Sequence, residues 1–311
     1  MNKYNYHVPV LLNEVIHYLV TDRSGIYVEC TLGGAGHSYS ILKQLNDDGR
    51  LIGIDRDKEA IEYAKQKLKL FEKQIILKYG TFSNLRSILD DEGIEGVDGI
   101  LLDLGLSSRH IDSVERGFSY LSDAPLDMRM NTEQELTAEA VINDFPVDTL
   151  KKIFREYGEE RFAGKIAARI DRARKKERIM RTKQLTDIIS GVVPYKMRIK
   201  TFSRIFQAIR IHVNDELNQL ERVLSQTIPS LKLKGRLVTI AYHSLEDRMI
   251  KAFMQEKANP CICPPELPVC VCGRNPEVRI LTKKIVLPTE KELSENPRSR
   301  SAKLRSFERI L

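Results

Sequence analysis

Residues 27–37 constrain the fold of this chain most, because they join an apolar strand to a glycine-rich turn and read YVECTLGGAGH. A second apolar segment, 50–55, follows and ends on Asp55. In open α/β folds, glycines after the first strand let the backbone approach a nucleotide, and an acid at the end of the next strand binds its ribose hydroxyls. The pattern therefore predicts an adenosine-containing cofactor at these two strand ends.

The same alternation continues through the first hundred residues. Apolar segments at 75–77 and 98–103 are separated by segments with helical spacing such as 58–70. Continuous apolar strands between helices are typical of a parallel sheet that is covered on both faces. The expected class is therefore α/β, with further strands at 235–241 and near 279–287.

The strand signal disappears in the middle of the chain. Residues 137–178 are helical in composition, with apolar residues spaced along one face. We expect an inserted all-helical domain at 113–198, between a first core part at 1–112 and a second at 199–311. A single amphipathic helix over 206–224 is expected in the second core part, because apolar residues recur there every three or four positions.

The positive charge of the chain is local. The formal net charge is +7, and residues 161–183 alone hold ten basic and two acidic side chains. Residues 298–309 repeat the basic pattern. Such a patch is the footprint of a polyanion partner, although a solvated helix face is the alternative. The candidate contacts to RNA are Arg161, Lys165, Arg169, Arg172, Arg174, Lys175, Lys176, Arg298 and Arg300.

The glycine spacing bears on the kind of cofactor. A dinucleotide pattern requires a third glycine where this chain has Tyr39. This departure favours a cofactor without a phosphate, such as S-adenosylmethionine. Glu29 and Asp103 end two other strands, and their carboxylates suit the ammonium and sulfonium charges of that molecule. Phe82 is a candidate to pack on the adenine, with an ordinary core position as the alternative.

The chain resembles the bacterial 16S rRNA cytosine-N4 methyltransferase family. The matching motifs extend along the whole sequence and are HVPVLLNE (7–14), CTLGGAGHS (30–38), GIDRD (53–57), LDLGLSS (102–108), RGFSY (116–120), PLDMRM (125–130), YGEER (157–161), FQAIRI (206–211), HSLEDR (243–248) and NPRSRSAKLR (296–305). The resemblance implies a class I (Rossmann-like) S-adenosylmethionine-dependent methyltransferase core with a helical insertion. It further implies N4-methylation of a cytidine in the decoding centre of 16S rRNA. We favour the assembled small subunit over naked rRNA as the substrate, because a basic patch gives affinity for the backbone but little choice of sequence.

Carried over position by position, the resemblance also implies a set of cofactor contacts. These residues are Gly33, Gly34, Ala35, Gly36, His37, Asp55, Phe82, Asp103 and His110.

Catalysis is harder to assign from the sequence. The N4 amine of cytosine is a poor nucleophile because its lone pair is delocalised into the ring. A hydrogen-bond acceptor must therefore bind the amine hydrogens during methyl transfer. Many amino-methyltransferases use a carbonyl of a Pro-Pro segment, but residues 104–108 contain no proline. We hypothesise that Asp103 or a backbone carbonyl near Ser107 accepts the proton, helped by His243. The base must be flipped into a pocket, for which Phe118, Tyr120 and Tyr242 are candidates, although core packing is the favoured role for each.

Other classes remain open. A nucleotide-dependent dehydrogenase and an RNA-binding assembly factor without chemistry are the alternatives, and a homodimer is compatible with the sequence. The spacing of Cys261, Cys263, Cys270 and Cys272 is tighter than in zinc knuckles, so a reduced surface loop is favoured and no metal is expected. No apolar run approaches the length of a membrane span and the N-terminus lacks a signal-peptide core, so a cytoplasmic protein is expected.

Overall fold

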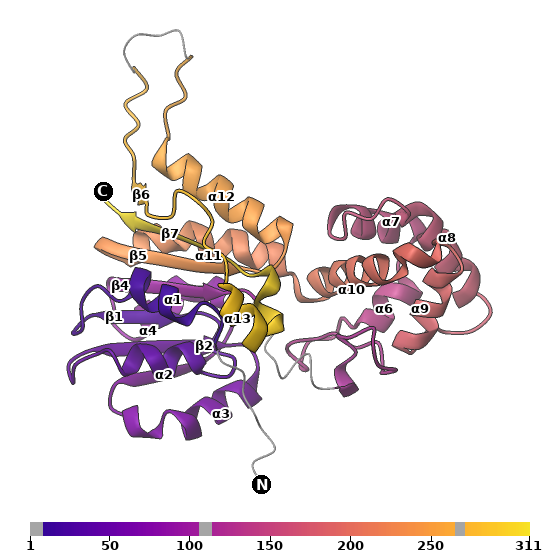
Figure 1. Cartoon of the computed structure of the whole chain (residues 1–311), viewed down its shortest axis with the longest axis horizontal. Helices are drawn as coiled ribbons and strands as arrows, with labels where there is room; N and C mark the ends of the chain where they lie inside the picture. Colours follow the sequence, from indigo (N-terminus) through magenta and orange to yellow (C-terminus); the bar gives the residue numbers. More distant parts are fainter. Residues whose placement is uncertain (1–8, 106–113, 265–270) are drawn as a thin grey trace. The chain divides into compact units, whose positions relative to one another are not determined.

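The computed structural model describes residues 9–105, 114–264 and 271–311. The chain forms two compact units, the first built from Met1–Gly105 with Gln219–Leu311 and the second from Leu106–Asn218 (Figure 1). The first boundary lies near the expected residue 112. The second lies at 218 rather than at 198, because the helix that follows 198 packs with the helical unit.

The first unit is built on a sheet of seven strands in the order β3-β2-β1-β4-β5-β7-β6. Neighbouring strands from β3 to β5 are parallel, whereas β7 is antiparallel to both β5 and β6. The strands are β1 (Ile26–Glu29), β2 (Arg50–Asp55), β3 (Ile75–Tyr79), β4 (Val97–Asp103), β5 (Leu231–Ala241), β6 (Val278–Ile280) and β7 (Lys303–Arg309). The carboxyl ends of β1, β2 and β4 therefore lie at one edge, where open α/β sheets bind ligands.

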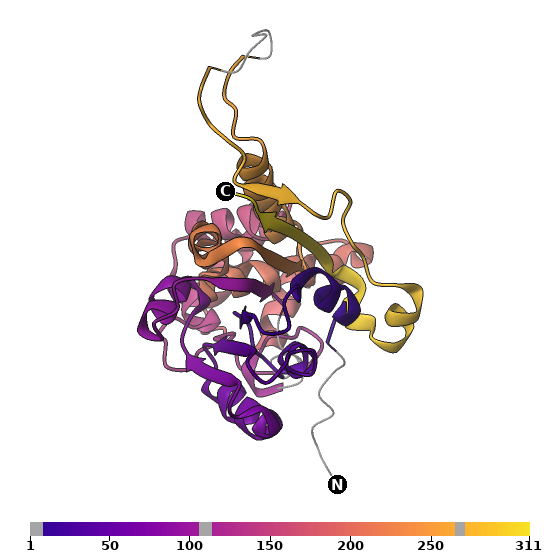
Figure 2. The ribbon, with the colours of Figure 1, turned by 90° about the vertical axis from the view of Figure 1, so that its left-hand side faces the viewer.

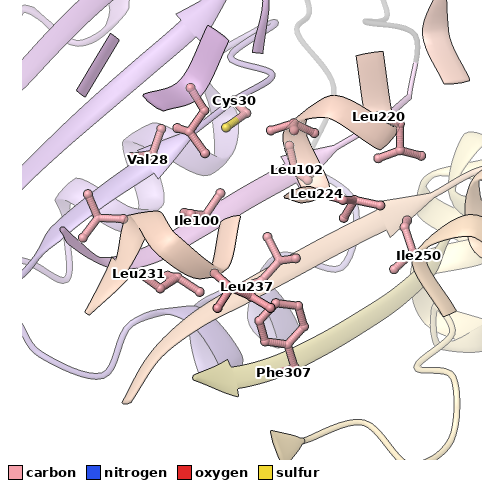
Figure 3. Packing of buried hydrophobic residues seen from close by; sticks show 14 of the residues in the cluster. Val28, Cys30, Ile100, Leu102, Leu220, Leu224, Leu231, Leu237, Ile250 and Phe307 are labelled. Atoms are coloured by element: carbon pink, nitrogen blue, oxygen red, sulfur yellow. The ribbon is translucent and has the colours of Figure 1, made fainter. Parts of the chain in front are cut away.

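Successive side chains of the central strands enter two different apolar cores. Val28 and Ile100 belong to one buried cluster, while their neighbours Tyr27 and Leu101 belong to another. This period of two is what a strand buried on both faces requires. Figure 3 shows the first cluster, where Leu224 and other helix residues meet the sheet. The helices of this unit are α1 (Leu12–Leu19), α2 (Gly36–Leu42), α3 (Lys58–Lys67), α4 (Leu85–Asp91), α11 (Glu216–Ser230), α12 (Ser244–Ala258) and α13 (Glu290–Glu295).

The second unit is helical in the residues that the structure describes and has its own core. Its helices are α6 (Ala138–Asp144), α7 (Val147–Glu156), α8 (Ala163–Arg174), α9 (Thr182–Ser190) and α10 (Arg198–Asn214). Ile205, Phe206 and Ile209 of α10 are buried in this core, so α10 belongs to the helical unit and not to the second core part. The Tyr120 ring packs 5.7 Å from the Phe206 ring, and Phe118 also packs against the cluster. Both residues thus contribute to core packing, as favoured above.

The expected single helix over 206–224 is wrong, because the chain breaks it at Asp215. This residue has a φ of 52°, in the left-handed region, and separates α10 from α11. Asp tolerates that conformation better than most residues. The Asn214 side chain fixes the break by accepting from the Met130 amide and donating to the Met128 carbonyl, both at 2.8 Å. Apolar residues continue with helical spacing through the break, which is why the pattern concealed it.

The last part of the chain also differs from expectation. The strand expected near 279–287 covers only Val278–Ile280, and the long terminal strand is β7. Of the helices in the described ranges, none has the length and apolar character that a membrane span needs.

Candidate functional site

The turn after β1 adopts the backbone conformation that a close ligand approach needs. Gly33 and Ala35 have φ values of 48° and 51°, both in the left-handed region. Gly36 begins α2, and a Cβ added there would lie 3.0 Å from the Pro9 ring. The turn is therefore a tightly packed bend leading into a helix, as the sequence predicted.

Asp55 ties this turn to the end of β2. One carboxylate oxygen accepts from the Gly33 amide at 2.7 Å, and the other accepts from the Asp57 amide at 2.9 Å. Carboxylate oxygens only accept hydrogen bonds, which is the property that binding of ribose hydroxyls requires. The position of Asp55 fits the role expected from the sequence.

A buried polar cluster lies beside the turn. The His37 side chain is 4% exposed, and its Nδ1 lies 3.6 Å from Asp103 Oδ2 and 3.9 Å from Glu29 Oε1. Its Nε2 lies 2.9 Å from the Val10 carbonyl. A carbonyl can only accept, so Nε2 carries a proton and donates it there. The Ser38 hydroxyl in turn donates to Glu29. The structure thus brings His37 together with both strand-end acids.

The two acids of this cluster, Glu29 and Asp103, both have raised pKa values. Burial raises the pKa of Glu29 to about 8, while the Ser38 hydroxyl opposes the shift and the Asp103 charge adds to it. Burial also raises the pKa of Asp103, and the nearby His37 opposes that shift. Asp103 Oδ1 is buried and has no hydrogen-bond partner among the described residues. Such an acceptor is costly unless a ligand supplies a donor or a positive charge.

Lys67 is a turn-holding residue that the sequence reasoning missed. From the end of α3, its ammonium donates to the Gly34 carbonyl at 2.7 Å. Burial lowers the pKa of Lys67, and the Glu29 charge opposes that shift. A lysine in the last turn of a helix is common in any fold, so the sequence carried no signal for this contact.

Phe82 lies just beyond β3, in the short turn Phe82–Asn84, and its half-buried ring packs against the core. The turn is fixed on α11, because Gln219 accepts from the Thr81 hydroxyl and the Gln226 amide donates to the Ser83 carbonyl, both at 2.6 Å. The Phe82 ring therefore contributes to core packing, and its contact with an adenine stays a prediction.

His243 follows β5, the strand next to β4, and precedes α12. Its Nδ1 accepts from the Glu246 amide at 3.3 Å, which requires Nδ1 to be unprotonated. Glu246 reciprocates by accepting from the Tyr242 amide at 2.9 Å and the His243 amide at 3.3 Å. The imidazole therefore caps a helix, a role the sequence did not suggest. Two further predicted residues, Ser107 and His110, lie outside the described residues.

The basic side chains of 161–176 divide into two groups. The first group is exposed. Lys165, Arg169 and Arg172 lie on α8 with a spacing of four and three, which places them on one helical face, and Arg161 and Lys176 lie just beyond its two ends. The second group is engaged within the unit, because Arg174 donates to the Ile142 and Phe145 carbonyls and to Asp171, while Lys175 pairs with Asp171 at 2.7 Å. We call the first group the α8 basic face; its members are Arg161, Lys165, Arg169, Arg172 and Lys176.

The C-terminal basic residues do not form a free tail. Arg298 and Arg300 lie in the short helical segment Pro297–Ser301, with Arg300 exposed. Lys303 and Arg305 belong to β7, and Arg305 donates to Asp247 at 2.7 Å. Much of the charge at this end therefore has a structural function.

The parallel sheet with its antiparallel final pair, the glycine turn and the acids at the strand ends define a Rossmann-like methyltransferase. A family profile described as the MraW methylase family matches residues 4–310, and the chain belongs to that family. It is 48% identical over 307 residues to ribosomal RNA small subunit methyltransferase H of Lachnospira eligens, covering 98% of each chain. The corresponding protein of Geobacter sulfurreducens is 49% identical over 307 residues, covering 98% of this chain and 99% of that one.

Proposed function

We propose that this enzyme transfers the methyl group of S-adenosylmethionine to N4 of a cytidine in the decoding centre of 16S rRNA, on the small ribosomal subunit. The observation that carries the proposal is a sequence identity of 48% and 49%, over 98% of this chain, to two proteins named ribosomal RNA small subunit methyltransferase H. The choice of N4 and of the decoding centre rests on the motif resemblance along the chain. The acids at the strand ends support a positively charged donor.

The first unit holds groups that fit this donor. S-adenosylmethionine supplies an electrophilic methyl group on a positively charged sulfur. Asp55 has lone pairs suited to ribose hydroxyls, and the bend at Gly33 lets backbone come close. Glu29 is a buried acid and Asp103 a partly buried one, and a nearby positive charge would stabilise both in their ionised form.

Asp103 is our candidate for the group that accepts the amine proton. Methylation of an amine nitrogen releases one proton, which must pass to an acceptor as the new bond forms. The Oδ1 atom of Asp103 is buried without a described hydrogen-bond partner, and its raised pKa makes the carboxylate a stronger base. A carbonyl near Ser107 is the other candidate, outside the described residues. His243 lies directly after β5, the strand that pairs with β4, and we propose that it assists this step from the N-terminus of α12.

Binding of the RNA is assigned to the α8 basic face. Its positively charged side chains attract the phosphates of the RNA backbone, independently of the base sequence. Selection of one cytidine then depends on flipping the base out of its stack into the site.

The test is methyl incorporation into purified small subunits from a strain that lacks this gene. The enzyme and labelled S-adenosylmethionine should place one methyl group, recovered as N4-methylcytidine after nuclease digestion and mass spectrometry. Naked 16S rRNA serves as a second substrate and should be methylated less. A methyl group on another atom would contradict the proposal. RNA binding without incorporation would favour an assembly factor instead.

A further inference from the structure

Three cysteine sulfurs converge in the long loop between α12 and β6. The Sγ atoms of Cys261, Cys263 and Cys272 all lie within 4.8 Å of one another. The first two come from the arm that leaves α12 and the third from the arm that returns to β6. Figures 1 and 2 both show these two arms extending side by side from the body of the first unit.

The sulfur separation matches a tetrahedral metal site. A Zn–S bond of about 2.3 Å in tetrahedral geometry places two sulfurs about 3.8 Å apart. The Sγ atoms of Cys261 and Cys272 are 3.9 Å apart. The Val271 amide also donates to the Cys263 sulfur at 3.4 Å, a contact that stabilises a thiolate. In the sequence, the single residue between Cys261 and Cys263 and between Cys270 and Cys272 argued against zinc. The structure instead brings together sulfurs from both arms of the loop.

In the described residues of the loop, the large apolar side chains beside the cysteines are exposed. Ile262 and Val271 flank the cysteines and are 66% and 77% exposed. The arms are joined at the base, where the Glu277 amide donates to the Lys257 carbonyl at 2.9 Å and the two side chains pair at 3.0 Å. Fixing a loop costs backbone conformational entropy at every residue that becomes ordered. Metal binding offsets that cost in small structures without a core.

We propose that Cys261, Cys263 and Cys272 bind one Zn²⁺ ion that closes this loop. Each thiol loses its proton to solvent when its sulfur binds the metal, so no oxidant or reductant is involved. Soft thiolate ligands in tetrahedral geometry select zinc over magnesium or calcium. The site is structural and independent of the proposed methyl transfer.

The first experiment measures zinc in the full chain after reconstitution with Zn²⁺ under reducing conditions and removal of loose metal by gel filtration. We expect about one zinc ion per chain in the wild type. Cys261→Ser and Cys272→Ser should each weaken zinc binding by at least about 100-fold in competition with a coloured chelator, because losing a ligand costs more than losing a residue that hydrogen-bonds a ligand. Cys30→Ala is the matched control, because Cys30 is buried in the sheet and should leave zinc binding unchanged. A wild type without zinc, or serine variants that retain it, would overturn the proposal.

Cobalt(II) provides an independent readout of the ligands. Under anaerobic conditions, Co²⁺ added to the metal-free chain should give sulfur-to-cobalt charge-transfer bands and the strong visible bands of tetrahedral coordination. Cys272→Ser should lose most of that intensity. A weak octahedral spectrum, an iron–sulfur chromophore in the isolated protein, or a Cys261–Cys272 disulfide in protein purified anaerobically would each contradict a zinc site.

Trypsin tests whether the metal orders the loop. Arg274 is exposed two residues after Cys272, so cleavage there should slow when Zn²⁺ is added to the wild type but not to Cys272→Ser. Equal cleavage rates with and without zinc would argue against a loop-closing site.

Discussion

The Gly33 amide donates a 2.7 Å hydrogen bond to Oδ2 of Asp55, so the acid that ends β2 holds the turn that follows β1. The bond joins two strands that are neighbours in the sheet but separated by α2 in the chain. One carboxylate thus shapes the turn and presents acceptors at the same edge. Removing the Asp55 carboxylate should therefore weaken cofactor binding in two ways, because the turn loses its support and the ribose loses its acceptors.

Asp55→Asn should weaken S-adenosylmethionine binding by about 10- to 100-fold, because a charge-assisted hydrogen bond contributes about 1.5 to 3 kcal/mol. Isothermal titration calorimetry measures the change. Asp57→Ala is the control, because Asp57 caps α3 by accepting from the Glu59 amide at 3.0 Å. That variant should lose about 1 kcal/mol of stability and retain its affinity. Equal loss of affinity in both variants would show that the loop as a whole, and not Asp55, is responsible.

Glu29→Gln should reduce the loss of stability between about pH 4.5 and about pH 8. The native Glu29 carboxyl keeps its proton up to about pH 8, whereas the unfolded one loses it near its ordinary pKa of 4.5. The native state therefore binds more protons between these values, and the free energy of unfolding falls as pH rises through that window. This group contributes a slope of about 1.4 kcal/mol per pH unit, which the neutral amide removes. Denaturant melts at several pH values should give a flatter profile for Glu29→Gln, and parallel profiles would contradict the assignment.

Cofactor binding should release a proton from the same residue. A positive charge near Glu29 lowers its pKa, so wild-type affinity for S-adenosylmethionine should rise with pH until about pH 8 and then level off. Calorimetry in buffers of different ionisation enthalpy measures the proton released. Glu29→Gln should bind more weakly and with little dependence on pH. An affinity that falls with rising pH in the wild type would exclude this coupling.

Lys67→Met should weaken cofactor binding without unfolding the protein. The substitution keeps the length of the side chain but removes the 2.7 Å hydrogen bond to the Gly34 carbonyl. We expect an affinity loss of about 5- to 10-fold, since an average hydrogen bond contributes about 1 kcal/mol. Lys65→Met is the matched control, because Lys65 lies on the same helix and pairs with Glu62 at the surface. This variant should retain its affinity for the cofactor. If both variants behave like the wild type, the contact does not order the turn.

The sequence predicted those features that a few neighbouring residues determine. The turn at 33–36 and the acid at 55 follow from backbone freedom and from strand ends, which a few neighbouring residues determine. The contact of Lys67 with Gly34 and that of Ser38 with Glu29 depend on how helices lie against the sheet. No residue near either side chain carries that information.

Charge in the sequence did not show which basic side chains have partners within the fold, and their contacts with RNA stay a prediction. Arg305 was counted with a basic tail, yet it lies in β7 and pairs with Asp247 of α12, far away in the chain. Arg174 was counted with the RNA contacts, yet it binds carbonyls at the ends of α6 and the following loop. A charged side chain acquires a structural role only through a partner that the fold supplies.

The α8 basic face should set the salt dependence of RNA binding. Arg169→Ala with Arg172→Ala should lower the slope of log affinity against log salt by about 1.4 to 1.8, because each lost phosphate contact removes about 0.7 to 0.9. Lys175→Ala with Lys183→Ala removes the same charge from residues already paired with Asp171 and Asp187. This control should leave the slope nearly unchanged. Identical slopes for the two double variants would mean that only net charge matters.

His243→Asn separates capping from catalysis. Asparagine is a good N-cap residue, so its side chain should replace Nδ1 as acceptor for the Glu246 amide and keep stability within about 1 kcal/mol of the wild type. If the imidazole assists transfer of the amine proton, kcat should fall by at least about 10-fold while the affinities for cofactor and RNA hold, and the pH dependence of kcat should change. His243→Ala provides the comparison, since it loses both the cap and the ring. Full turnover by His243→Asn beside a destabilised His243→Ala would assign His243 to capping alone and leave Asp103 as the acceptor to test.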